Sequence, residues 1–98
     1  VYPPSFMGPR SKVKDSLICN GCGVFGTAEH SIMGIGAILH DDAYIKDSIL
    51  LPGSRVRKNC TLIRTIVNED IDIPEGSIIG SEDGPITVVG KDFKGGKK

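Results

Sequence analysis

The sequence has no tryptophan, only two tyrosines and three phenylalanines, and no net charge. Twelve basic residues balance twelve acidic ones, so the chain lacks the positive surface that attracts nucleic acid or an anionic membrane. No apolar run approaches the roughly 20 residues that cross a bilayer, and no signal-peptide pattern begins the chain. Three cysteines are too few, and odd in number, for a secreted disulfide scaffold. We therefore expect a cytoplasmic protein.

Helical patterning is also scarce, because few stretches carry an apolar stripe with a period of 3.6 residues, whereas glycine occurs 13 times. A chain of 98 residues is long enough for one small domain. It opens at Val1 in a proline-rich stretch that includes Pro3 and Pro4. This start predicts a linker over residues 1–10 and a fragment of a longer protein.

A short phrase recurs four times, each time a hydroxyl residue followed by two aliphatic residues. The four copies begin at Ser16, Ser31, Ser48 and Thr65, and the last three are 17 residues apart. Within this repeat an aliphatic residue returns every five or six positions, usually preceded two residues earlier by a small one. The series comprises Val13, Ile18, Val24, Ala28, Met33, Leu39, Ile45, Leu50, Val56, Leu62, Val67, Ile73 and Ile79. The step from Val24 to Ala28 is only four residues, which predicts a contracted corner.

The repeat predicts an all-β fold, a parallel β-helix of about four coils of roughly 17 residues over residues 11–80. Residues two apart in a strand face the same side, so the small and the large aliphatic residue both face inward. Turn residues between the triplets supply three corners for each coil. The spacing is similar to the hexapeptide repeat of left-handed parallel β-helices, and the handedness rests on that similarity alone. A β-sandwich is the alternative, but it would not keep a 17-residue register through three consecutive coils.

Residues 81–98 are predicted to form a C-terminal strand and a flexible basic tail. Solenoid ends need a cover, because an uncovered end coil presents unpaired strand edges and a bare core. The segment 85–89, followed by Phe93, is a candidate cap or docking strand, and residues 94–98 are the expected tail.

The middle residue of each triplet should point outward, and on one face these residues are all aliphatic. They are Leu17, Ile32, Ile49 and Ile66. An exposed apolar stripe of this size usually marks an interface, so we predict that it packs against a partner chain or a further domain. The alternative is that the segment Tyr2–Met7 folds back over it.

No catalytic constellation emerges from the remaining polar residues. Cys22 and Cys60 fall at small inward positions and Cys19 at a corner, so the sequence predicts structural roles for the thiols. The Cys19–Cys22 pair has no second pair with which to complete a zinc site. His30 and His40 both fall at corners, where a single histidine could still act as the base of an acyltransferase. We expect no metal and no cofactor in this chain.

The order of short sequence motifs along nearly the whole chain is similar to that in the C-terminal domain of bacterial glucose-1-phosphate adenylyltransferases. The matching stretches include Val13-Lys14-Asp15-Ser16-Leu17-Ile18, Gly26-Thr27-Ala28-Glu29-His30-Ser31, Lys46-Asp47-Ser48-Ile49-Leu50-Leu51-Pro52-Gly53, Arg57-Lys58-Asn59-Cys60 and Ile73-Pro74-Glu75-Gly76-Ser77-Ile78-Ile79-Gly80.

The resemblance implies a parent enzyme that makes ADP-glucose from ATP and glucose 1-phosphate with Mg²⁺, for glycogen synthesis. Catalysis would lie in an N-terminal domain, so no catalytic residue carries over to this fragment. The implied role is assembly of a homo- or hetero-tetramer and regulation by a phosphorylated effector. Lys91 aligns with a basic residue of the family's allosteric anion site, while a second basic position falls at Glu69. A catalytically silent paralogue and a hexapeptide-repeat acyltransferase subunit are the alternatives.

Overall fold

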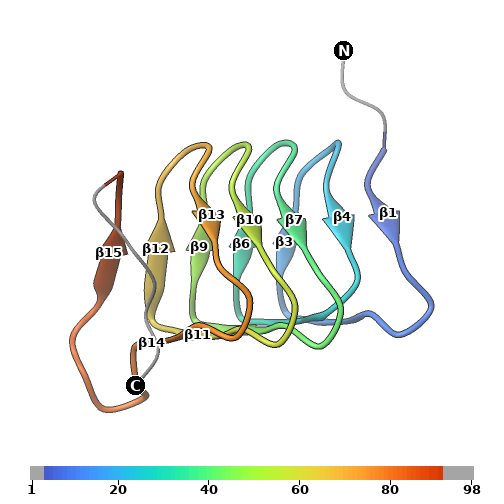
Figure 1. Cartoon of the computed structure of the whole chain (residues 1–98). Helices are drawn as coiled ribbons and strands as arrows, with labels where there is room; N and C mark the ends of the chain where they lie inside the picture. Colours follow the sequence, from blue (N-terminus) through green and yellow to red (C-terminus); the bar gives the residue numbers. More distant parts are fainter. Residues whose placement is uncertain (1–3, 92–98) are drawn as a thin grey trace.

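A computed structural model describes residues 4–91, and all regular structure within that range is β-strand. The strands form three five-stranded parallel sheets, which we call A, B and C, wound as one solenoid (Figure 1). Sheet A holds β1 (Phe6–Met7), β4 (Gly23–Val24), β7 (Ile38–Leu39), β10 (Arg55–Val56) and β13 (Asp72–Ile73). Sheet B holds β2 (Lys12–Lys14), β5 (Thr27–Glu29), β8 (Tyr44–Lys46), β11 (Thr61–Ile63) and β14 (Ile78–Ile79). Sheet C holds β3 (Leu17–Ile18), β6 (Ile32–Met33), β9 (Ile49–Leu50), β12 (Thr65–Val67) and β15 (Thr87–Val89).

Each coil contributes one strand to each sheet, and successive coils pair in parallel register. In sheet C, Ile32 pairs with Ile49 and Ile49 with Ile66, which reproduces the 17-residue spacing of the sequence. The predicted parallel β-helix is therefore confirmed. Within residues 4–91 no helix is long and apolar enough to cross a bilayer.

The core is a column of aliphatic side chains along the solenoid axis. From Val24 to Ile79 every aliphatic position of the predicted inward series is buried. The small residues two positions earlier are buried as well in most coils, including Ala37, Ala43 and Cys60. Ile71, the one large side chain among them, is only partly buried and packs against the edge of the core. Small side chains at these positions leave the narrow interior to the aliphatic ones.

The corners turn through residues with positive φ. The sheet C to sheet A corners use glycine in three coils, with φ of 74° at Gly21, 74° at Gly36 and 76° at Gly53. The fourth such corner uses Asp70, at φ 58°. Aspartate is one of the few residues other than glycine that tolerates this region.

The contracted corner predicted between Val24 and Ala28 consists of Phe25 and Gly26. A Cβ atom on Gly26 would overlap the carbonyl oxygen of Ala43 and lie 2.7 Å from that of His40. Only glycine lets the shortened corner of this coil approach the next one so closely. The Phe25 ring lies over the outside of sheet A, with its centroid 5.6 Å from that of Phe6.

Both ends of the described chain contribute a strand to the solenoid. β1 lies within residues 1–10 and pairs with β4 in sheet A, so Phe6 and Met7 do not lie across sheet C. β15 lies within residues 81–98 and pairs with β12 in sheet C. Val1, Tyr2 and Pro3, together with Phe93 and the predicted tail at residues 94–98, fall outside the described residues.

The loop between β14 and β15 departs from the regular repeat. Glu82 in this loop forms an ion pair with Lys46 of β8, with 2.6 Å between Nζ and Oε1. Lys46 precedes the loop by two coils, so the loop folds back along the corner between sheets B and C.

Candidate interaction surface

The four aliphatic residues predicted to form an interface lie in one continuous ladder on the outside of sheet C. Leu17 pairs with Ile32, Ile32 with Ile49, and Ile49 with Ile66. Leu17 and Ile32 are exposed, whereas Ile49 and Ile66 are partly buried. The inward neighbours, such as Met33 and Leu50, are fully buried. Outward and inward positions are thus as the alternation predicts.

The structure adds a fifth residue to the ladder. Val88 of β15 pairs with Ile66, and 62% of its surface is exposed. Thr87-Val88-Val89 repeats the hydroxyl–aliphatic–aliphatic phrase, but it lies outside the 17-residue spacing because the preceding loop is long. The phrase itself, searched without fixed spacing, would have found Val88. We call Leu17, Ile32, Ile49, Ile66 and Val88 the apolar ladder.

A second ladder, of hydroxyl groups, runs along the neighbouring corner between sheets B and C. The hydroxyl oxygen of Ser16 accepts a hydrogen bond of 3.0 Å from the amide of Ser31. Ser31 accepts in turn from Ser48, and Ser48 from Thr65, at 3.2 Å each. Each hydroxyl also donates to the carbonyl two residues before it, at 2.8 Å in Ser31 and Ser48. The hydroxyl residue of the repeated phrase thus has a bonding role beyond its small size.

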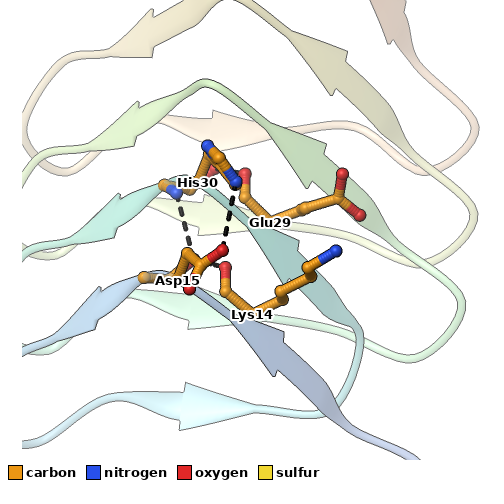
Figure 2. Close-up of polar contacts among 6 residues, drawn as sticks. Lys14, Asp15, Glu29 and His30 are labelled. Carbon is orange, nitrogen blue, oxygen red and sulfur yellow. Dashed lines mark hydrogen bonds and ion pairs between the residues drawn. The ribbon is translucent and has the colours of Figure 1, made fainter.

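His30 lies at this corner beside a carboxylate. Its Nε2 is 3.3 Å from Oδ2 of Asp15, and its amide donates to the carbonyl of Lys14 at 2.9 Å (Figure 2). Both side chains are more than half exposed. In sheet B, Lys14 pairs with Glu29 and Glu29 with Lys46, so opposite charges alternate along the corner. The arrangement resembles an ordinary cross-strand ladder of surface charges.

His40 lies at the corner between sheets A and B, whereas His30 lies at the corner between sheets B and C. Burial lowers the pKa of its imidazole, and the nearby charge of Arg57 lowers it further. Arg57 is itself bound to Asp72 through two hydrogen bonds, 2.8 Å from Nε to Oδ1 and 2.6 Å from Nη2 to Oδ2. The two histidines therefore do not share a site.

The three cysteines are free thiols, and two of them are core residues. The Cys22 thiol donates to the carbonyl of Gly34 at 3.1 Å, and the Cys60 thiol to that of Pro74 at 3.0 Å. Burial raises the pKa of both thiols, which keeps them protonated and unreactive near neutral pH. Cys19 is partly buried at its corner. Across residues 4–91, no three histidine, cysteine or carboxylate groups are placed to hold a metal ion together.

Lys91 lies at an open pocket of about 510 Å³ near the C-terminal end of the solenoid. The other lining residues are Leu51, Asn68, Glu69, Asp70 and Ile71. One cation therefore shares the pocket with two carboxylates. An anion that approached Lys91 here would meet two like charges as well as the ammonium group.

A family model and individual relatives both match this chain over most of its length. Residues 5–85 match the family model described as GlmU-like, C-terminal hexapeptide. Over 80 residues the chain is 34% identical to glucose-1-phosphate adenylyltransferases of Bacillus thuringiensis (strain Al Hakam) and Bacillus anthracis. It is 32% identical over 80 residues to that of Bacillus cereus (strain Q1). Each alignment covers 82% of this chain but only 21% of the relative, within its C-terminal region. The chain thus spans about a fifth of the length of these curated relatives.

Proposed function

The chain belongs to the family of GlmU-like C-terminal hexapeptide domains, and from this premise we propose that it is the assembly and regulatory domain of a sugar nucleotidyltransferase. The parent enzyme makes ADP-glucose from ATP and glucose 1-phosphate for glycogen synthesis. The domain itself is noncatalytic. ATP and Mg²⁺ bind the part of the parent that lies outside the matched region, and the parent is a cytoplasmic homo- or hetero-tetramer.

The observation that carries this proposal is the position of the match. The 80 aligned residues fall in the C-terminal region of glucose-1-phosphate adenylyltransferases, four-fifths of whose length lies elsewhere. The apolar ladder supports an assembly role, because an aliphatic column that crosses all five strands of a sheet is unusual on a surface left to water. The free thiols support a reducing compartment.

The test compares the 98-residue chain with the longer protein encoded by its gene. We expect ADP-glucose and pyrophosphate from the longer protein supplied with ATP, glucose 1-phosphate and Mg²⁺, and none from the 98-residue chain. Ile49→Asp should lower the oligomeric state of the longer protein in sedimentation without unfolding it. Synthesis of ADP-glucose by the 98-residue chain alone would refute a noncatalytic role.

The regulatory role in this proposal concerns the pocket at Lys91. Lys91 is the candidate anion-binding residue, but Glu69 and Asp70 line the same pocket. We therefore expect a weak response to phosphorylated effectors. A catalytically silent paralogue would give the same domain and the same pocket, and the longer protein would then make no ADP-glucose by itself.

One observation favours the rival function, a hexapeptide-repeat acyltransferase subunit. The approach of Asp15 Oδ2 to His30 Nε2 is the geometry that orients a general base. Both groups are exposed on an open corner, however, and water would compete for them. Acetyl-CoA turnover by the chain, lost in His30→Ala and kept in His40→Ala, would establish this rival instead.

A further inference from the structure

The first coil, β1 to β3, exposes apolar side chains that every later coil buries. Met7, which pairs with the inward residue Val24, and Val13 both face the interior, yet 44% and 36% of their surfaces are exposed. Their counterparts in the second coil, Val24 and Ala28, are fully buried. Phe6 and Leu17, at outward positions of the same coil, are each 61% exposed. Across the described residues 4–91, the interior of the solenoid is therefore open at its N-terminal end.

Backbone groups at this end also lack partners among the described residues. Phe6 and Gly8 donate their amides to the second coil, at Cys22 and Val24, so the N–H and C=O of the intervening Met7 point the other way. Val13 in β2 and Ile18 in β3 are oriented in the same way, because the residues before them, Lys12 and Leu17, also donate their amides to the second coil. The three strands thus present a template for one more layer.

At the opposite, C-terminal end of the solenoid the inward side chains are buried. The last inward side chains there, Ile73, Ile79 and Val89, are all at most 5% exposed. Within residues 4–91, an uncovered core is therefore found at the N-terminal end only. This end is also where the polypeptide enters the solenoid, since β1 begins the stack at one extremity (Figure 1).

Charge argues against a second copy of the chain as the cover. β2 reads Lys12-Val13-Lys14, and both lysines are exposed. Among residues 4–91 neither lysine forms an ion pair. A two-fold end-to-end contact would bring these lysines toward their own copies, and edge lysines are a common device against such pairing. The rim instead favours a partner with an acidic surface.

We infer that the open first coil is the docking site of the domain that precedes it in the parent chain. The contact is apolar at its centre, and acidic residues of that domain surround it and face Lys12 and Lys14. This inference rests on the proposed function. The relatives carry four-fifths of their length outside the matched C-terminal region. A domain tethered at residue 4 is held near this end at an effective concentration on the order of millimolar. It covers Phe6, Met7 and Val13, and the apolar ladder beyond Leu17 stays available for other subunits.

The experiment compares amide hydrogen exchange in the longer protein and in the 98-residue chain. In the 98-residue chain, the amides of Met7, Val13 and Ile18 should exchange freely. In the longer protein, we expect exchange across residues 5–19 to slow at least about tenfold. Val13→Glu places a charge in the apolar centre of the contact and should restore fast exchange. Phe6→Ser is the second variant, since its exposed outward side chain can be replaced without entering the core.

Ile78→Glu is the matched control, because Ile78 is 45% exposed in the last coil, at the far end of the solenoid. It should leave exchange across residues 5–19 unchanged. Equal exchange in the two proteins would overturn the inference even if the longer protein makes ADP-glucose. Slow exchange in the 98-residue chain together with dimerisation would overturn it in favour of a second copy. Protection without ADP-glucose synthesis would support the docking site and refute the proposed function.

Discussion

The amide of Thr65 donates a hydrogen bond of 3.2 Å to the hydroxyl oxygen of Ser48, which stands 17 residues earlier in the neighbouring coil. Both residues are buried, with at most 1% of their surface exposed. The same hydroxyl donates to the carbonyl of Lys46 at 2.8 Å. A residue that the repeat presents as merely small thus gives the buried Thr65 amide an acceptor and donates to a second backbone group.

Ser48→Ala should therefore lower the free energy of unfolding by about 1–3 kcal/mol, because it leaves the buried Thr65 amide without an acceptor. Urea denaturation followed by circular dichroism measures this change. Ser54→Ala is the matched control, since the Ser54 hydroxyl is buried without a hydrogen-bond partner. Its removal should be neutral or stabilising. Equal losses in the two variants would show that size alone sets this position.

Met33→Asp should unfold the domain, because Met33 is fully buried and an unpaired charge there has no partner. Ile49→Asp, on the outward side of the neighbouring coil, should keep the circular dichroism spectrum of the folded chain. It should weaken subunit assembly in the longer protein instead. Similar unfolding of both variants in a thermal melt would contradict the assignment of inward and outward positions.

Stability should fall in acid partly through Asp72. Hydrogen bonds from Arg57, and then its charge, hold the pKa of the Asp72 carboxyl below its usual range, although burial acts in the opposite direction. The unfolded chain, with an aspartate pKa of about 3.9, then binds more protons than the folded one at low pH. The contribution is present above that value and is lost as pH falls through the lower pKa of the folded state. The urea midpoint of Asp72→Asn should depend less on pH between about 5 and 3 than that of the wild type.

Gly26→Ala should destabilise the contracted corner by about 1–3 kcal/mol, as an overpacked site does. The new methyl group would meet the carbonyl oxygens of Ala43 and His40, which belong to backbone and cannot move aside freely. Gly90→Ala is the comparison, because its methyl group would meet only the side-chain amide of Asn68, at 3.3 Å. A shift of the thermal midpoint in Gly90→Ala as large as that in Gly26→Ala would refute this explanation.

Glu69→Lys in the longer protein should strengthen its response to phosphorylated effectors. The substitution replaces one of the two carboxylates in the Lys91 pocket with a second cation. The concentration of effector that gives half-maximal activation should fall, and the fall should shrink at high salt because screening weakens the attraction. Glu75→Lys, at an exposed corner outside that pocket, controls for the change in net charge. An equal effect of the two substitutions would argue against a site at Lys91.

Sequence alone was enough to predict the repeat and the direction of most side chains. A period of two within strands and of 17 between coils is a local property, and each buried aliphatic from Val24 to Ile79 obeys it. The apolar ladder followed from the same alternation. Val88 was not recognised as a member because the loop before β15 lengthens the last coil. The residue types of Thr87-Val88-Val89 match the repeated motif, but their distance from Thr65 does not match the 17-residue spacing.

Other features depend on which coils are neighbours, and only the tertiary structure decides them. Val13 has the inward pattern of a core residue, yet it is exposed because β2 is the end strand of its sheet among the described residues, with no further coil stacked on it. Lys46 reaches Glu82, 36 residues away, because the loop folds back across two coils. The hydroxyl of Ser48 finds the Thr65 amide only once the coils stack. Periodicity determines which way a side chain faces, whereas burial and bonding require a partner that the chain brings near only on folding.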